Sequence, residues 1–308
     1  MRIEKASAAQ QGEALTRGAT LPAKDFLRDL VRKCGVNIHP YPSRRHLTLD
    51  YPVSDVPRYG HGKGPHSKLH ALINAERSRF DQVLDEIAAN RDLIQSITAS
   101  KTSSDPLEPF WNNRWLPPLD AAVLMHMLLK LRPRSYMEIG SGNSTAFARH
   151  AISWGSLPTQ IVSIDPEPRR GIDEACDEVI RSPLEATDLT RFAALRAGDI
   201  LFFDGSHRTF MDSDVTVFFL EVLPTLQPGV IVQVHDIFWP DDYPPQWGWR
   251  YYSEQYMLGL YLLLARPQVL MANAFVSTDP QLSVKAAALT PGEAVLDYWG
   301  VSFWFVSS

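Results

Sequence analysis

A repeated rhythm of short strand, tight turn and helix runs from Ser135 towards the end of the chain, and this rhythm restricts the fold more than any other feature. Strands that alternate with helices form a doubly wound α/β sheet. The sequence predicts helices at 144–152, 169–176, 212–223 and 253–265. It predicts strands at 135–139, 160–164, 178–181, 199–203, 229–234, 268–272 and 301–306.

Polar residues follow several of these strands at the point where each strand ends. They are Glu138 with Gly140 and Gly142, then Asp165, Asp204 and the pair His235-Asp236. In an open α/β sheet, ligands bind beyond the carboxyl ends of the strands. These residues are therefore the candidates for a functional site.

The glycine-rich turn after the strand 135–139 favours a ligand other than a nicotinamide dinucleotide. A dinucleotide fingerprint needs a third glycine at position 145, which is Thr145. A carboxylate at Glu138 would repel a pyrophosphate, but it could orient an amine or the amides of the loop. The alternative is a tight strand-to-helix turn with no ligand, and the strand context favours the binding site.

At these residues the chain resembles the class I S-adenosylmethionine-dependent methyltransferases over about residues 115–306. The acidic-x-Gly-x-Gly-x-Gly motif of that family matches Glu138, Gly140 and Gly142, with Ser144 in the last glycine position. Asp165 matches the acidic residue that binds the ribose hydroxyls. Asp204 matches the motif beside the transferred methyl group. The resemblance implies S-adenosyl-L-methionine as cofactor, bound by Glu138, Gly140, Ser141, Gly142, Ser144, Asp165 and Asp204.

The resemblance also implies the fold in more detail. It implies a Rossmann-like seven-stranded sheet of order 3-2-1-4-5-7-6, with the last strand antiparallel and a helical extension at the N-terminus. The predicted organisation is an irregular basic arm at 1–65, a helical accessory region at 66–110 and the methyltransferase domain at 111–308. Apolar residues at three- and four-residue spacing between 67 and 98 predict an amphipathic helix or a helical hairpin in the accessory region.

Within the superfamily, the residues Asp204-Gly205-Ser206-His207 and His235-Asp236 resemble the branch of macrocin-type sugar O-methyltransferases and cephalosporin hydroxylase. That resemblance implies Asp204 and Asp236 as ligands of a divalent cation, Mg²⁺ or Mn²⁺, with His235 as a third ligand or as a base. His207 is the other candidate base, and Asp204 is a third candidate catalytic residue. A cluster without metal, in which one carboxylate is protonated, is the alternative.

The resemblance implies methyl transfer, with O-methylation of a small-molecule or sugar-containing acceptor as the leading function. A hydroxylase-like oxygenase and a non-catalytic cofactor-binding protein are the alternatives. The aromatic segment 238–256 is either a wall for the acceptor or a packed cap, which in a homo-oligomer would form a contact between copies of the chain.

Charge and composition limit the partners of the chain. Residues 1–70 carry 12 Lys and Arg against 6 Asp and Glu, but the whole chain has a net charge of −5. An acidic body without a nucleic-acid motif argues against nucleic acid as a partner. No apolar segment approaches the roughly 20 residues of a membrane helix, so no membrane partner is expected. Two lone cysteines, Cys34 and Cys176, and the lack of a secretory signal favour the cytoplasm.

Overall fold

Seven strands form one mixed sheet in the structure, a computed structural model that describes residues 52–289, 291–294, 296 and 298–308. The strand order is β3-β2-β1-β4-β5-β7-β6, which confirms the predicted order. Strands β1 to β5 are mutually parallel, whereas β7 is antiparallel to both β5 and β6. The strands are β1 Ser135–Ile139, β2 Gln160–Ile164, β3 Glu178–Ile180, β4 Ile200–Phe203, β5 Ile231–Val234, β6 Val269–Ala272 and β7 Phe303–Val306.

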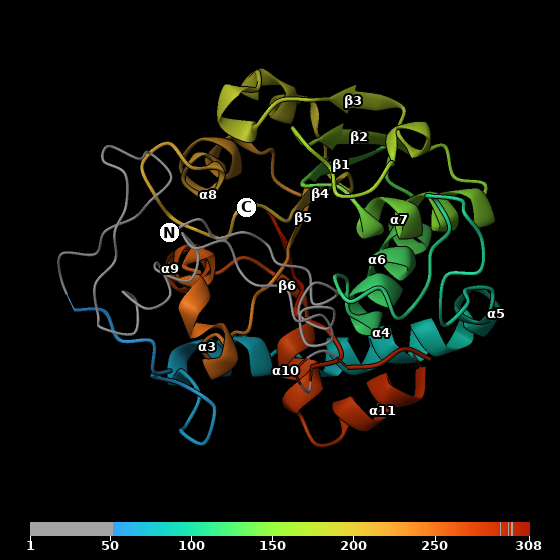
Figure 1. Cartoon of the computed structure of the whole chain (residues 1–308). Helices are drawn as coiled ribbons and strands as arrows, with labels where there is room; N and C mark the ends of the chain where they lie inside the picture. Colours follow the sequence, from blue (N-terminus) through green and yellow to red (C-terminus); the bar gives the residue numbers. More distant parts are fainter. Residues whose placement is uncertain (1–51, 290, 295, 297) are drawn as a thin grey trace, which may run out of the picture. The chain divides into compact units, whose positions relative to one another are not determined.

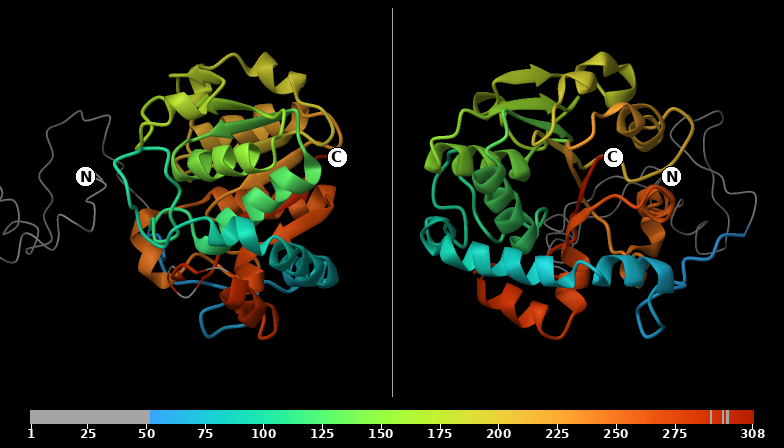
Figure 2. Two further views of the ribbon diagram at one scale, coloured as in Figure 1. Left: turned by 90° about the vertical axis from the view of Figure 1, so that its right-hand side faces the viewer. Right: turned by 180° about the vertical axis from the view of Figure 1, so that it is seen from behind.

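Helices cover both faces of this sheet within the compact unit of residues 55–308. Helices α6 and α7 pack side by side on one face, and α8 and α9 lie on the other (Figures 1 and 2). All residues of β4 and β5 are therefore buried, which explains why both strands are nearly continuous apolar runs. The helices are α3 Ser67–Asn74, α4 Arg77–Ala89, α5 Arg91–Gln95, α6 Pro118–Leu131, α7 Asn143–Trp154, α8 Asp214–Val217, α9 Glu254–Ala265, α10 Asn273–Thr278 and α11 Leu282–Leu289.

Two predicted helices differ from the observed ones. The segment 169–176 forms only a 3-10 turn at Asp173–Ala175, because Gly171 disfavours a helix there and only scattered residues are buried. The segment 212–223 begins as α8, widens into a π-helix at Phe218–Val222 and closes in a 3-10 turn at Leu223–Thr225. Pro224 has no backbone N–H to continue a regular helix.

The helical stretch before the sheet consists of three short helices rather than one helix or a hairpin. Helix α4 packs against α6, β6 and α11. Phe80 of α4 is fully buried against Phe275 of α10, with 5.9 Å between ring centroids. The predicted helical extension is thus part of the same packed unit, whereas residues 1–51 of the predicted basic arm lie outside the described residues. The boundaries at 65 and 110 stay predictions.

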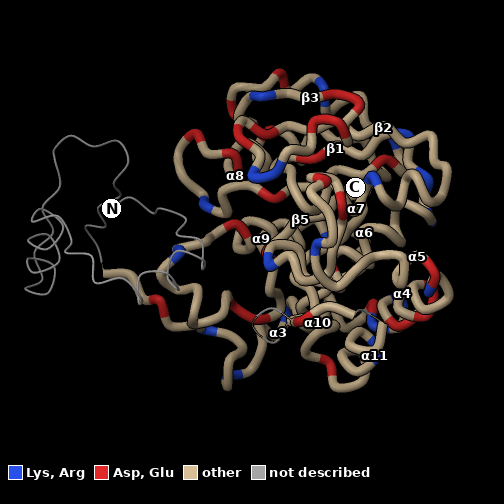
Figure 3. Tube along the Cα trace, turned by 45° about the vertical axis from the view of Figure 1, so that its right-hand side comes forward, with Lys and Arg blue, Asp and Glu red and all other residues tan. Residues whose placement is uncertain are grey.

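Charged residues of both signs are interspersed along the described part of the chain (Figure 3). Ion pairs such as Arg77–Asp279 and Lys285–Asp81 join α4 to the C-terminal helices. None of the helices in the described residues is long and apolar enough to span a membrane.

Candidate functional site

The carboxylate of Glu138 lies inside the protein beneath the glycine turn. Its side chain is fully buried, and it accepts hydrogen bonds from the Tyr136 hydroxyl at 2.6 Å and the Thr145 hydroxyl at 2.5 Å. The same Thr145 oxygen accepts the backbone N–H of Gly142 at 3.0 Å. Glu138 therefore holds the shape of the turn, which is the loop-orienting alternative of the sequence analysis.

Gly140 allows the turn to pass directly over the end of β4. Its φ of +81° lies in the left-handed region, and a Cβ built on it would stand 1.9 Å from the carbonyl oxygen of Asp204. Only glycine fits this contact. At Gly142, by contrast, a Cβ would meet nothing within 4 Å, so that residue faces open space at the start of α7.

Asp165, at the end of β2, fastens the turn from the other side. Its Oδ2 accepts the backbone N–H of Ser141 at 2.9 Å, and its Oδ1 accepts that of Glu167 at 2.8 Å. The hydroxyl of Ser141 bonds to that of Ser163, and both Ser141 and Ser144 are buried. A carboxylate oxygen has a second lone pair, so Asp165 can still accept hydrogen bonds from a ligand.

A cavity of about 280 Å³ lies over the turn. Its floor consists of residues 141–144 together with Asp204, and its other wall comes from the segment before α6 and from residues after β2. Trp115, 49% exposed, stacks under the guanidinium of Arg169 at 4.5 Å in this wall. Trp111 instead belongs to the core, with 1% exposure. Glu138 and Asp165 do not line the cavity.

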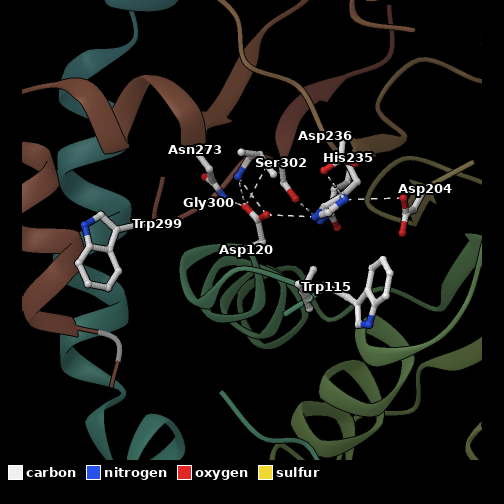
Figure 4. A network of polar contacts seen from close by, with 12 residues as sticks. Trp115, Asp120, Asp204, His235, Asp236, Asn273, Trp299, Gly300 and Ser302 are labelled. Atoms are coloured by element: carbon white, nitrogen blue, oxygen red, sulfur yellow. Dashed lines mark hydrogen bonds and ion pairs between the residues drawn. The ribbon is translucent and has the colours of Figure 1, made fainter. Parts of the chain in front are cut away.

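The polar residues that end β4 and β5 converge (Figure 4). His207 Nε2 lies 3.2 Å from Asp204 Oδ1 and 3.4 Å from Asp236 Oδ2. His235 Nδ1 lies 3.6 Å from Asp204 Oδ1 and 3.4 Å from Asp236 Oδ1. The backbone of His207 has a φ of +61° and that of Asp236 a φ of +56°, conformations that cluster at functional sites in other proteins.

Two further carboxylates, which the sequence analysis missed, complete this cluster. Asp120 of α6 lies 3.2 Å from His235 Nε2, and its oxygens also accept the N–H groups of Val301 and Ser302. Glu254, the first residue of α9, bonds to His207 Nδ1 at 2.7 Å. Both carboxyl side chains are fully buried. The sequence did contain a signal for Asp120, because it is the single acidic residue in the apolar stretch 118–131.

The carboxylates and imidazoles shift one another's pKa values. Burial alone lowers the pKa of His207 and of His235, but the surrounding carboxylates, Asp236 foremost, outweigh burial and raise both values well above 6.5. Burial raises the pKa of Asp204, yet the two imidazoles outweigh it and hold that pKa below its usual range. Burial raises the pKa of Glu254 to about 7 despite its hydrogen bond to His207.

This arrangement does not fit the predicted metal centre. No group of three or more His, Cys, Asp and Glu side chains among the described residues has the arrangement of metal ligands. His207 already lies between Asp204 and Asp236, so an imidazole supplies the positive charge that the two carboxylates need.

The aromatic segment after β5 divides into a packed part and an exposed part. Phe238 and Tyr243 form a small hydrophobic cluster with Tyr298, against which Trp247 and Tyr252 pack. This half corresponds to the packed cap of the sequence analysis. Three aromatic residues of the segment stay exposed by more than 40%: Trp249, Tyr251 and Tyr256.

We expect Gly140→Ala to destabilise the fold by about 2–4 kcal/mol, because the added methyl group clashes with the Asp204 carbonyl and the backbone is left-handed. Gly142→Ala is the matched control and should lose less than about 1 kcal/mol. Urea unfolding of both variants measures the difference. Equal stability of the two variants would show that the close approach to Asp204 is not a constraint.

Glu138 should make stability depend on pH. Burial raises its pKa from 4.5 to about 7. A carboxyl group with a raised folded-state pKa stabilises the fold below pH 4.5, and this contribution is lost as the pH rises through about 7. The free energy of unfolding of the wild type should therefore fall relative to that of Glu138→Gln by about 3 kcal/mol across this window. A pH-independent difference between the two proteins would contradict the assignment.

Comparison with known proteins supports one assignment. Residues 137–237 match the family model described as a methyltransferase domain. No curated protein matches the chain. Among solved structures, an O-methyltransferase from Bacillus cereus in complex with SAH has 16% identity and a TM-score of 0.37, covering 78% of this chain and 99% of that one. The SAH-bound methyltransferase PaMTH1 of Podospora anserina has 13% identity and a TM-score of 0.36, covering 82% and 94%. These structural likenesses are remote, whereas the family match covers β1 to the end of β5, where the candidate site lies.

Proposed function

We propose that the chain binds S-adenosyl-L-methionine and transfers its methyl group to a hydroxyl of a small-molecule or sugar-containing acceptor. The observation that carries the proposal is the turn of residues 140–144, which faces a cavity bounded by Asp204. This turn lies within the stretch that matches a methyltransferase domain. The same stretch ends at the His207, His235 and Asp236 cluster, so cofactor and acceptor would meet at Asp204.

In this proposal the cofactor lies over the turn at the start of α7. S-adenosyl-L-methionine supplies a methyl group that its sulfonium already activates for transfer. Asp165, which lies beside the cavity and not in its lining, would accept the ribose hydroxyls with its free lone pairs, and Gly142 would leave room for the cofactor. Arg169, on the cavity wall with no acidic partner among the described residues, would bind the cofactor's carboxylate.

We propose that His207, acting as one unit with the carboxylates it contacts, takes part in removing the proton of the acceptor hydroxyl, with the proton entering this unit at the ionised Asp204. Its Nδ1 is fixed by Glu254, which leaves Nε2 directed at Asp204 and Asp236. Both ring nitrogens of His235 are buried and lack an aligned hydrogen bond, so His235 is the less accessible of the two candidates. Alignment of the acceptor and removal of its proton are the tasks left to the protein.

The finer assignment, to the branch of macrocin-type O-methyltransferases, is also part of the proposal. It is supported by the proximity of His207, His235 and Asp236, which that resemblance places around the acceptor.

We propose no step through a metal ion, because the donor groups contact one another as ion pairs. Addition of Mg²⁺ or Mn²⁺ to EDTA-treated protein should leave its thermal unfolding temperature unchanged. A stabilisation by either ion that Asp236→Ala abolishes would restore the metal hypothesis.

Asp165→Ala should weaken binding of S-adenosyl-L-methionine by about 1.5–3 kcal/mol, because the ribose loses an ionised acceptor. Titration calorimetry on the full chain measures the affinity. Glu167→Ala, which removes an exposed carboxylate from the same loop, is the matched control and should bind normally. NAD should not bind to either protein.

Two outcomes would contradict this assignment. Equal affinities of Asp165→Ala and the wild type would mean that Asp165 does not hold the ribose. Binding of NAD in preference to S-adenosyl-L-methionine would mean that the site serves a dehydrogenase instead.

A further inference from the structure

Two segments far apart in the sequence are joined beside His207. One is the loop after β4, residues 204–213, and the other is residues 245–253, before α9. The backbone N–H of Ser253 donates to the carbonyl of His207 at 2.8 Å, and that of Thr209 donates to the Ser253 hydroxyl at 2.8 Å. The Tyr252 ring lies 4.6 Å from the His207 ring, centroid to centroid. The two segments therefore lie side by side next to His207.

Each segment brings an arginine to the ring of Tyr252. The guanidinium carbon of Arg208 lies 5.2 Å from the ring centroid, and that of Arg250 lies 5.4 Å from it. Arg208 Nε donates to the carbonyl of Arg250 at 3.0 Å, which ties the two residues together. Two positive charges thus lie beside one aromatic ring.

No carboxylate among the described residues forms an ion pair with Arg208 or Arg250. Other arginines do have such partners, including Arg149 with Asp177 and Arg191 with Glu178. The Nε of Arg250 is buried without a hydrogen-bond partner, and only one of its N–H groups finds a side-chain acceptor, the hydroxyl of Tyr252. Arg208 and Arg250 therefore keep N–H donors without acceptors and positive charges without a carboxylate partner, and a bound anion would supply both the acceptors and the opposite charge.

Large apolar side chains stand exposed on the same two segments. Phe210 is 43% exposed and Met211 is 97% exposed on the loop after β4, and Trp249 is 56% exposed on the other segment. Exposed apolar residues gathered beside a site indicate a binding surface. The surroundings of the two arginines therefore suit a ligand with an apolar or aromatic body.

We propose that Arg208 and Arg250 bind an acidic group of the methyl acceptor, so that the acceptor is a small apolar or aromatic molecule with a carboxylate or a phosphate. The inference rests on the proposed function in one respect, which is that it identifies the bound ligand with the methyl acceptor. Guanidinium groups bind both kinds of anion through paired hydrogen bonds. The aromatic rings of Tyr252 and Trp247 hold the guanidinium groups in place, and Arg250 lies 4.1 Å above the Trp247 ring.

The test compares two probes that differ only in charge, 4-hydroxybenzoate and 4-hydroxybenzamide. Their binding to the full chain is titrated by ligand-observed NMR, with and without SAH. The wild type should bind the carboxylate about tenfold more tightly than the amide. The double variant Arg208→Gln with Arg250→Gln should bind the two probes about equally, whereas the corresponding double lysine variant should keep part of the preference.

Arg91→Gln is the matched control, because it removes an exposed arginine of α5 that belongs to neither segment, and it should keep the full preference. Thermal unfolding of each variant shows whether it is folded. The proposal is overturned if the wild type shows no preference for the carboxylate or binds neither probe, or if the folded double glutamine variant keeps the preference. If the protein prefers the carboxylate but does not bind SAH, the anion subsite is supported and the proposed cofactor is rejected. Failure of the subsite and failure of the proposed function can therefore be distinguished.

Discussion

Four carboxyl groups crowd around two imidazoles at the carboxyl ends of β4 and β5, and the assembly of the unit depends on their mutual neutralisation. A carboxylate removed from water without a partner is costly, and here the partners are distributed over α6, the ends of β4 and β5, and α9. Helix α6, the ends of two strands and helix α9 are held at one point because each supplies a charge that the others need. The members are Asp120, Asp204, His207, His235, Asp236 and Glu254.

Different strands of the sheet contribute different parts of the candidate site. The ends of β1 and β2 shape the turn under the cavity, while the ends of β4 and β5 supply groups that can move a proton. The two halves meet where the backbone of Gly140 passes against the carbonyl of Asp204, so a displacement of one half moves the other. The distance between a ligand on the turn and the imidazole of His207 is thus set by main-chain contact rather than by flexible side chains.

Much of the sheet could be predicted from the sequence, because strands buried on both faces read as short apolar runs with polar residues at their ends. Residues Asp165 and Asp204 were found for that reason. Asp120 and Glu254 were not, because each starts from a helix and reaches the site only through tertiary packing. The metal ligands Asp204 and Asp236 were implied by the family resemblance, whereas the sequence could not show that His207 would lie between the two carboxylates. Residues 169–176 were misread as a helix because local propensity outweighed the lack of a buried face.

The inward position of Glu138 changes what its presence in a sequence means. Its carboxylate serves the hydroxyls of Tyr136 and Thr145, and through them the turn. Loss of ligand binding during evolution would leave those bonds, and the need for them, intact. An acidic residue two places before the glycine turn is therefore a marker of correct folding, and a relative that had abandoned its chemistry would retain it. The half-buried carboxylate of Asp204 differs from that of Glu138, because it both lines the cavity and pairs with His207 and His235, so its replacement would disturb the site and the charge cluster together.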